Sequence, residues 1–256
     1  MPLHLIGLGL HDVRDVTVKG LERIRSCKSV YAEFYTAILT GTTHAQLEAF
    51  LQVPVKTLDR LGVEKGAVDL VAEAKTKDVA LLTAGDPLTA TTHTDLMLRC
   101  HAEGVAFHVV HAPSIYSAAP GLLGLQHYKF GRTTTLVRPE ANWFPTSPFD
   151  AVAENHARGL HTLVLLDIKA DERYFMTANE GLRLLLELAK RTGNAWFSSD
   201  SQVGVVARAG SDEGLRVTGT VSALLESDFG LPLHCIVVPG ELQVVEAEAW
   251  AILARR

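Results

Sequence analysis

The chain has 256 residues, 47% of them hydrophobic, which is enough apolar material for one large core or two smaller ones. Its formal net charge of −5 argues against a broad cationic face that would neutralise a phosphate backbone, so we expect no nucleic-acid partner. The cysteines Cys27, Cys100 and Cys235 lack any CxxC spacing, which predicts neither a disulfide framework nor a zinc site and fits a reducing cytoplasm.

The N-terminal run from Leu3 to Leu10 is apolar, but no basic residue precedes it and His4 and two glycines interrupt it. It predicts a first strand and not a signal peptide. The longest uninterrupted apolar runs are strand-sized, far below the roughly 20 residues that a membrane span requires. We therefore expect a soluble protein with no membrane partner.

Short apolar runs alternate with amphipathic segments along the first half of the chain. The runs predict strands at Leu3–Leu8, Ser29–Glu33, Pro54–Thr57, Val79–Thr83 and Ala106–His111. Apolar residues spaced by three and four predict helices at Thr17–Cys27, Val68–Lys75 and Thr94–Glu103, the first with a threonine cap. This alternation is typical of parallel strands joined by crossover helices. It predicts an N-terminal α/β domain at residues 1–113.

Glycine and proline become frequent after His111, so we expect a domain border there and a second α/β domain at residues 114–256. Thr177 and Glu180 have the spacing of a capping box before a run of leucines, which predicts a helix. The polar-aromatic segment Trp143–Ser147 predicts either a recognition loop or a packed surface loop. Further strands are predicted at Thr162–Asp167, Val203–Ala209, Arg216–Gly219 and His234–Val238.

Two turns in the first half follow predicted strands and admit two interpretations each. Gly7 and Gly9 match the start of a dinucleotide fingerprint, but Asp12 replaces the third glycine, so a tight turn without a ligand stays open. Asp86 follows a strand in the stretch LLTAGDPLTATTH. It either caps local amides in an Asx turn or accepts hydrogen bonds from a ligand at the carboxyl end of the strand.

His108 and His111 are three residues apart, as two metal ligands on a helix would be. Their neighbours predict a strand, in which this spacing puts the rings on opposite faces, so we expect no metal site. Pro113 ends the strand, and Ser114 and Tyr116 then offer hydroxyl groups at a ligand-binding turn or at an ordinary helix start.

Three strand ends of the second half carry residues of interest. Asp167 in LLDIKA fits a solvated strand end. Ala209 and Gly210 have little or no side chain, which allows a planar ring to approach the backbone. His234 begins a strand, where an isolated histidine is expected to be a structural donor rather than a catalyst.

The order of the motifs is more specific than any one of them. They are LIGLGLHDVRDVTVKGLE, AEFYT, GDPLTATTH, HAPSIYSA, NWFPTSPFDA, LLDIKA with YFMTANE, ARAGS and VPGELQVVEAE. Over nearly the whole chain they resemble the diphthine synthases, a family in the tetrapyrrole-methylase-like class of S-adenosylmethionine enzymes. The resemblance implies a homodimer of two α/β domains with the methyl donor in the cleft between them. The donor-contacting residues that it implies are Leu10, Asp86, Thr89, Ser114, Ile115, Leu166, Ala209 and His234.

The reaction that the resemblance implies is trimethylation of the amino group of a modified histidine on translation elongation factor 2, in diphthamide biosynthesis. It implies no metal. No catalytic residue is assigned, although His108, His111 and His234 are candidate bases beside bulk water. Two alternatives stay open. One is a precorrin-type tetrapyrrole methyltransferase, and the other is a non-catalytic nucleotide-binding module that uses the Gly7–Gly9 turn.

Overall fold

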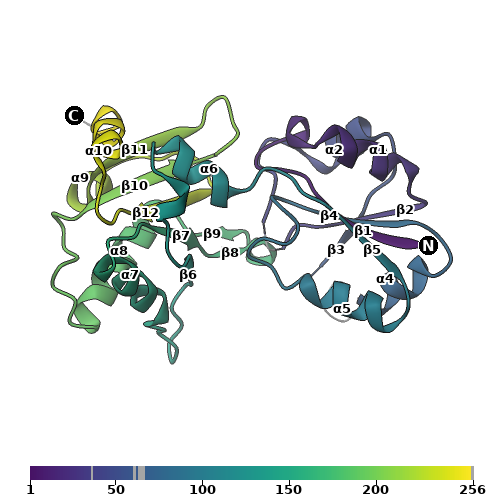
Figure 1. The fold of residues 1–256 in the computed structure, drawn as a ribbon, viewed down its shortest axis with the longest axis horizontal. Helices are drawn as coiled ribbons and strands as arrows, with labels where there is room; N and C mark the ends of the chain where they lie inside the picture. Colours follow the sequence, from purple (N-terminus) through teal and green to yellow (C-terminus); the bar gives the residue numbers. More distant parts are fainter. Residues whose placement is uncertain (36, 60–61, 63–66, 255–256) are drawn as a thin grey trace. The chain divides into compact units, whose positions relative to one another are not determined.

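The computed structural model describes residues 1–35, 37–59, 62 and 67–254, which form two compact units (Figure 1). The first unit comprises residues 1–115 and 169–173, and the second comprises 116–168 and 174–256. Each unit has a sheet with helices packed on it, which confirms the prediction of two α/β domains. The division falls after residue 115, and the short segment 169–173 belongs to the first unit. Thr36 of the AEFYT motif lies outside the described residues.

The sheet of the first unit is parallel throughout, in the order β3-β2-β4-β1-β5. Its strands are β1 (Pro2–Gly7), β2 (Ser29–Glu33), β3 (Lys56–Leu58), β4 (Val79–Thr83) and β5 (Ala106–Val110). All the strands predicted for this half are confirmed, with small shifts at their ends.

Helices cover both faces of this sheet (Figure 1). Along β1, Leu3 and Leu5 pack towards α4 and α5, whereas Ile6 packs towards α1 and α2. Successive side chains of a strand point to opposite faces, so one apolar strand contributes to two cores. The helices are α1 (Val18–Ser26), α2 (His44–Leu51), α4 (Ala67–Ala74) and α5 (Thr94–Ala102).

Side chains cap two of these helices. The Oγ1 atom of Thr17 accepts a hydrogen bond from Gly20 N at the start of α1, as predicted. The helix α2 is additional to the predicted ones and begins at a capping box of Thr43 and Gln46. Leu47, Phe50 and Leu51 have helical spacing, so both the apolar pattern and the cap were local signals for this helix.

β1 and β4 are neighbours from which the chain departs towards opposite faces. After β1 the chain passes through α1 to β2, and after β4 it passes through α5 on the other face to β5. In open α/β sheets, ligands bind beyond the carboxyl ends of the strands at such a switch point. The residues that follow β1, β4 and β5 are therefore placed where a small molecule is expected.

The second unit is built on a mixed sheet in the order β11-β10-β12-β7-β6. β6 is parallel to β7, and the other neighbouring strands are antiparallel. The predicted strands of this half are confirmed, and β6 is additional. The strands are β6 (Thr134–Leu136), β7 (Thr162–Leu166), β10 (Gln202–Ala207), β11 (Leu215–Thr220) and β12 (His234–Val238), with a separate pair, β8 (Ile168–Lys169) and β9 (Tyr174–Phe175).

The core of the second unit lies between this sheet and α7, α8 and α9. The predicted capping box opens α8: Thr177 Oγ1 accepts from Glu180 N, and the Glu180 carboxylate accepts from Thr177 N. Leu182 and Leu185 of α8 are fully buried in this core. The helices are α6 (Ile115–Leu122), α7 (Ser147–Ala157), α8 (Ala178–Arg191), α9 (Val221–Leu225) and α10 (Val244–Ile252).

The predicted polar-aromatic loop is shorter than expected. Ser147 begins α7, and Pro148 fits the first helical turn because its missing N–H would have no partner within the helix. Phe149 is fully buried. Trp143, by contrast, is 51% exposed and its backbone exchanges two hydrogen bonds with Glu140 in a tight turn.

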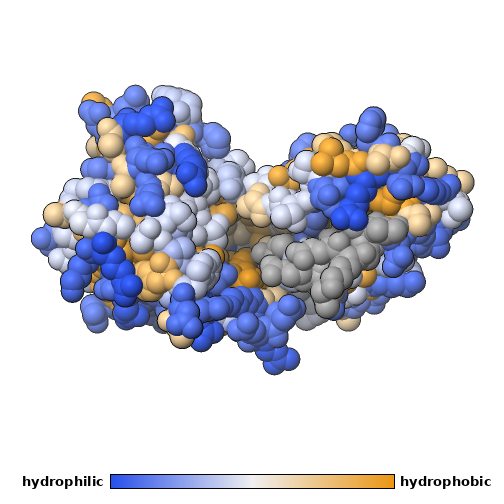
Figure 2. Space-filling view, turned by 90° about the horizontal axis from the view of Figure 1, so that it is seen from below, coloured by the Kyte–Doolittle hydropathy of each residue, from blue (hydrophilic) through white to orange (hydrophobic). Residues whose placement is uncertain are grey.

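Hydrophilic residues dominate the surface seen in Figure 2, with hydrophobic residues interspersed among them. Exposed apolar side chains include Val244 and Ile252 of α10. Among the helices that the structure describes, none combines the length and the hydropathy of a membrane span.

Candidate functional site

Three strand ends of the first unit converge on Gly7, the last residue of β1. A Cβ atom here would lie 2.5 Å from Gly85 O and 2.7 Å from Ala112 Cβ. It would also lie 2.9 Å from Pro87 Cδ. Gly85 and Pro87 follow β4, and Ala112 follows β5. Since only glycine permits this approach, the loops after β1, β4 and β5 form one connected surface.

Gly9 and Gly85 link two of these loops directly. They exchange backbone hydrogen bonds of 3.3 and 2.7 Å, and both have positive φ angles, +85° and +72°. A Cβ on Gly9 would lie 2.2 Å from Asp15 Cβ. Asp12, which replaces the third glycine of the fingerprint, caps a short 3-10 turn at Val13–Asp15. Contacts within the protein therefore account for Gly7 and Gly9 in a tight turn, and contact of this loop with the methyl donor stays a prediction.

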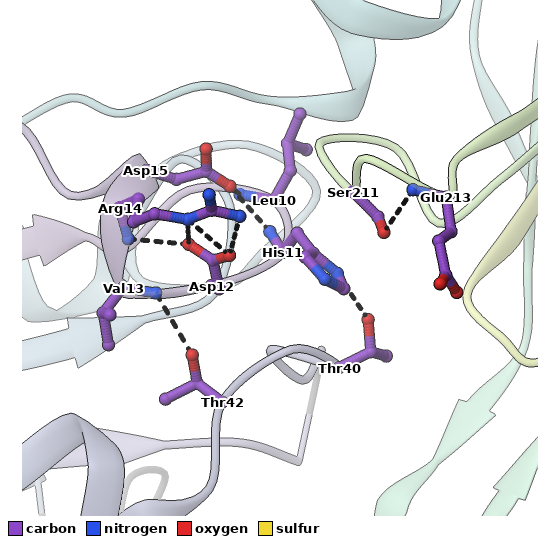
Figure 3. A network of polar contacts seen from close by, with 10 residues as sticks. All are labelled: Leu10, His11, Asp12, Val13, Arg14, Asp15, Thr40, Thr42, Ser211 and Glu213. Carbon is purple, nitrogen blue, oxygen red and sulfur yellow. Dashed lines mark hydrogen bonds and ion pairs between the residues drawn. The ribbon is translucent and has the colours of Figure 1, made fainter.

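Leu10 lies in the same loop, and its backbone is held by a carboxylate (Figure 3). The amides of Leu10 and His11 both donate to Asp15 Oδ2, at 3.0 and 2.8 Å. The His11 ring lies 3.0 Å from Thr40 Oγ1, which connects this loop to the one that follows β2. Because its amide is engaged, we expect Leu10 to contact a ligand through its carbonyl or its side chain.

Asp86 ties the β4 loop to the β5 loop. One carboxylate oxygen accepts from Leu88 N at 3.1 Å and from Thr89 Oγ1 at 3.2 Å. The other lies 2.7 Å from His111 Nδ1 and 3.3 Å from Ala112 N. Burial opposes the charge, but the hydrogen bonds from Leu88 N, His111 and Ala112 N hold the pKa of Asp86 below its usual value. The Asx turn is confirmed, and a direct contact of Asp86 with a donor stays a prediction.

Predicted donor residues thus gather at one edge of the first sheet. Most of them lie in the loops after β1, β4 and β5, and one, Ile115, is the first residue of α6. They are Leu10, Asp86, Thr89, Ser114 and Ile115.

The other predicted donor residues share one end of the second sheet. Leu166 ends β7 and His234 begins β12. β12 runs antiparallel to β7 and β10, and His234 pairs with Ala207, two residues before Ala209. The register therefore brings Leu166, Ala209 and His234 to the same end of this sheet.

The chain matches a known family over most of its length. The family model of tetrapyrrole (corrin/porphyrin) methylases matches residues 2–225. A diphthine synthase of Methanococcus maripaludis (strain C5) is 49% identical over 247 residues, covering 96% of each protein. A diphthine synthase of Methanocaldococcus jannaschii is 49% identical over 249 residues, again covering 96% of each. The chain belongs to the diphthine synthase family of tetrapyrrole methylases.

The fold agrees with this membership. A crystal structure of diphthine synthase matches with a TM-score of 0.89 at 34% identity, covering 99% of this chain and 96% of that chain. Membership confirms the prediction of an S-adenosylmethionine-dependent methyltransferase. It removes the support for a non-catalytic nucleotide-binding module. Because the relatives are diphthine synthases, it also favours that reaction over methylation of a tetrapyrrole.

In this member of the diphthine synthase family, His234 is engaged at both ring nitrogens. Its Nδ1 atom accepts a hydrogen bond from Ala178 N at 3.1 Å, and this bond caps α8. Its Nε2 atom donates to Leu231 O at 2.9 Å. Burial lowers the pKa of His234. A neutral ring with both nitrogens bonded is a structural tie and does not suit a base. We therefore expect His234 to contact the donor through its backbone.

His108 lies within β5, two residues before the strand ends, and stacks on His4 with ring centroids 5.3 Å apart. His111, in contrast, follows the strand and contacts Asp86. The predicted alternation of faces does not apply to His111, because β5 ends at Val110, and the two candidate bases have different surroundings. Within residues 1–35, 37–59, 62 and 67–254, no three His, Cys, Asp or Glu side chains are grouped to hold a metal ion.

Glu33 and His93 also lie at this edge, and sequence reasoning did not single them out. Glu33 ends β2, and its Oε1 lies 3.7 Å from His93 Nε2, both side chains being almost fully buried. The other ring nitrogen of His93 lies 3.1 Å from Pro87 O. This pair supports the Asp86 loop from below the surface. Its only signal in the sequence is that the two residues belong to the AEFYT and GDPLTATTH motifs.

Proposed function

We propose that the protein methylates the amino group of the modified histidine, 3-amino-3-carboxypropyl-histidine, of translation elongation factor 2. Three successive transfers from S-adenosylmethionine give a trimethylated product on the route to diphthamide. The observation that carries this proposal is the 49% identity to diphthine synthases over 96% of the chain. The connected loop surface at β1, β4 and β5 supports it, because that edge is where an α/β sheet binds a small molecule.

We assign donor binding to the residues gathered at the two sheet ends. Asp86 holds the loop that contains Thr89, and we place any direct contact of its carboxylate away from the methyl group. A carboxylate beside the sulfonium would stabilise the ground state more than the dispersed charge of the transition state. The full set is Leu10, Asp86, Thr89, Ser114 and Ile115 from the first unit, with Leu166, Ala209 and His234 from the second.

The chemistry needs a neutral amine in line with the carbon–sulfur bond. The nitrogen lone pair forms a bond to the methyl carbon while the carbon–sulfur bond breaks, and its electron pair goes to sulfur. Because the charge only moves from sulfur towards nitrogen, positioning of the two reactants contributes most of the rate enhancement. The protein's task is to bind the donor rigidly and to present the amine without its extra proton.

The partners follow from the substrate. A protein substrate requires an exposed contact surface, and Trp143, which is 51% exposed, is our candidate for it.

We place the reaction in the cytoplasm, where translation occurs, and Cys27, Cys100 and Cys235 are free and buried, which fits a reducing compartment. We further propose a homodimer and no nucleic-acid partner, the latter because the net charge is −5.

Mass spectrometry of the factor tests the reaction. Elongation factor 2 that carries the aminocarboxypropyl-histidine is incubated with the enzyme and S-adenosylmethionine. We expect mass increments of one, two and finally three methyl groups on that histidine. A factor that stays unmodified, while a precorrin-type tetrapyrrole is methylated under the same conditions, would contradict the proposal.

Calorimetry tests donor binding separately. We expect saturable binding of S-adenosylmethionine and none of NAD, because the Gly7–Gly9 turn lacks the third glycine of a dinucleotide site. Binding of NAD alone would support the nucleotide-binding alternative instead.

A further inference from the structure

His111 is held at one ring nitrogen and open at the other. Its Nδ1 lies 2.7 Å from Asp86 Oδ2, and its side chain is 70% exposed while that of Asp86 is 10% exposed. A carboxylate only accepts hydrogen bonds, so Nδ1 carries the proton of this contact. In the neutral ring the lone pair is then on Nε2. Among the residues that the structure describes, none forms a hydrogen bond to this Nε2.

Asp86 is a rigid support for the ring. Three further donors, Leu88 N, Thr89 Oγ1 and Ala112 N, fix the position of its carboxylate. A carboxylate that accepts from Nδ1 fixes the tautomer and the orientation of an imidazole and stabilises the imidazolium that forms when Nε2 takes a proton. The contact therefore has the geometry of an oriented base and not of an isolated surface histidine.

The proposed reaction requires a base at this edge. An amine of this type is largely an ammonium at neutral pH, since an α-amino group has a pKa of about 8. An ammonium has no lone pair and cannot attack the methyl carbon. Each monomethylated and dimethylated product also carries a proton that must leave before the next transfer.

We propose that His111 is the proton acceptor for the substrate amine, with Asp86 as its positioning residue. This inference rests on the proposed function and deepens it. The substrate ammonium gives a proton to Nε2 of His111, which frees the nitrogen lone pair. That lone pair forms the nitrogen–carbon bond as the carbon–sulfur bond breaks towards sulfur, leaving S-adenosylhomocysteine. The imidazolium releases its proton to water before the next cycle.

The structure favours His111 over the other candidate bases. Both ring nitrogens of His234 are bonded within the protein, and His108 lies within β5 against His4. His111 lies in the loop between β5 and α6 that contains the predicted donor residue Ser114. In the part of the chain that the structure describes, Asp86 is the titratable side chain that contacts it.

The test compares the full-length wild-type enzyme with His111→Asn. The Asn amide keeps an N–H near the position of Nδ1 and so preserves the bond to Asp86, but it has no basic nitrogen. We expect kcat near neutral pH to fall by about 100-fold, the lower end of general-base effects. The affinity for S-adenosylmethionine by calorimetry should change by less than about twofold. The pH profile of kcat should differ from that of the wild type, because the variant has no basic nitrogen at this position.

A second variant distinguishes the loss of a basic nitrogen from misfolding of the protein. His111→Ala leaves space for a ring, and we expect added imidazole to restore activity in this variant. His101→Asn is the matched control, because His101 is an exposed histidine of α5 away from this edge. It should retain the wild-type rate and pH profile.

The outcomes distinguish a failure of the proposed function from a failure of the inference about His111. A wild-type enzyme that does not methylate the factor overturns the proposed function itself. If the wild type is active and His111→Asn keeps both the wild-type kcat and the wild-type pH profile, the inference about His111 is wrong and the function stands. The inference is equally wrong if the affinity for the donor falls as much as kcat does, or if imidazole fails to rescue His111→Ala.

Discussion

Lys129 and Glu246 are 117 residues apart in the chain, yet Lys129 Nζ lies 2.7 Å from Glu246 Oε2 inside the second unit. The carboxylate is fully buried and also accepts from Gln126 N and Gln243 N, and its other contact is His161 Nε2 at 3.1 Å. Burial opposes the charge of Glu246, but these bonds, the one from Lys129 first, lower its pKa to about 2. This network fastens α10 to the rest of the unit.

Glu246→Gln should destabilise the protein by about 3 kcal/mol near neutral pH, because it leaves the Lys129 ammonium without its counter-charge. Since the folded pKa of about 2 lies below the ordinary value of 4.5, the stabilisation is present above 4.5 and is lost as the pH falls towards 2. Urea unfolding at several pH values gives the free energy of unfolding of the wild type and of Glu246→Gln. The difference between the two should decrease as the pH falls below 4.5. Glu187→Gln, in an exposed pair with Arg191, is the control and should change stability by less than about 0.5 kcal/mol. An equal loss of stability in Glu246→Gln and Glu187→Gln would contradict a stabilising role for the buried charge of Glu246.

Gly7→Ala should disrupt the loop surface, since its Cβ would lie 2.5 Å from a backbone oxygen of Gly85 that cannot rotate away. We expect a loss of about 1–3 kcal/mol in stability and a clear loss of affinity for S-adenosylmethionine. Gly121→Ala is the matched control, because nothing lies within 4 Å of its added Cβ in α6. Thermal unfolding and calorimetry measure both effects. Wild-type donor affinity in Gly7→Ala would show that the three loops do not form the donor site.

Asp86→Asn should weaken donor binding by at least tenfold, which corresponds to about 1.4 kcal/mol. The amide has only one oxygen, so it cannot accept from Leu88 N and Ala112 N at opposite ends as the carboxylate does. Calorimetry gives the affinity and a single-turnover assay gives the rate. If turnover is abolished while the affinity is unchanged, Asp86 acts through His111 alone and its assignment to donor binding is wrong.

Trp143→Ala should raise the apparent KM for elongation factor 2 severalfold, because large exposed aromatic side chains supply much of the energy of protein contacts. The affinity for S-adenosylmethionine should stay the same. Steady-state kinetics with varied factor concentration measures the first quantity, and calorimetry the second. Phe144 lies against Arg191 and is not expected to contribute to the factor contact. An unchanged KM would remove the Trp143 turn from the recognition surface.

Local patterns predicted every strand of the two sheets except β6, and the helix after Thr177, because short continuous apolar runs and capping at a spacing of three are properties of a short stretch of chain. They did not indicate β6 or α7. β6 has only three residues and is stabilised by pairing with β7, while α7 begins in a proline- and aromatic-rich segment typical of a loop. Such segments take their structure from neighbours that are remote in sequence.

The sequence by itself determined the α/β class, the family, and the presence of an acid at the end of β4. Only the tertiary structure decided what that acid contacts. Asp86 meets His111 and Ala112, 25 and 26 residues further along, because β4 and β5 flank β1 and Gly7 lets their loops touch beyond its end. Strand order is set by how whole strands and helices pack, and no local periodicity encodes it.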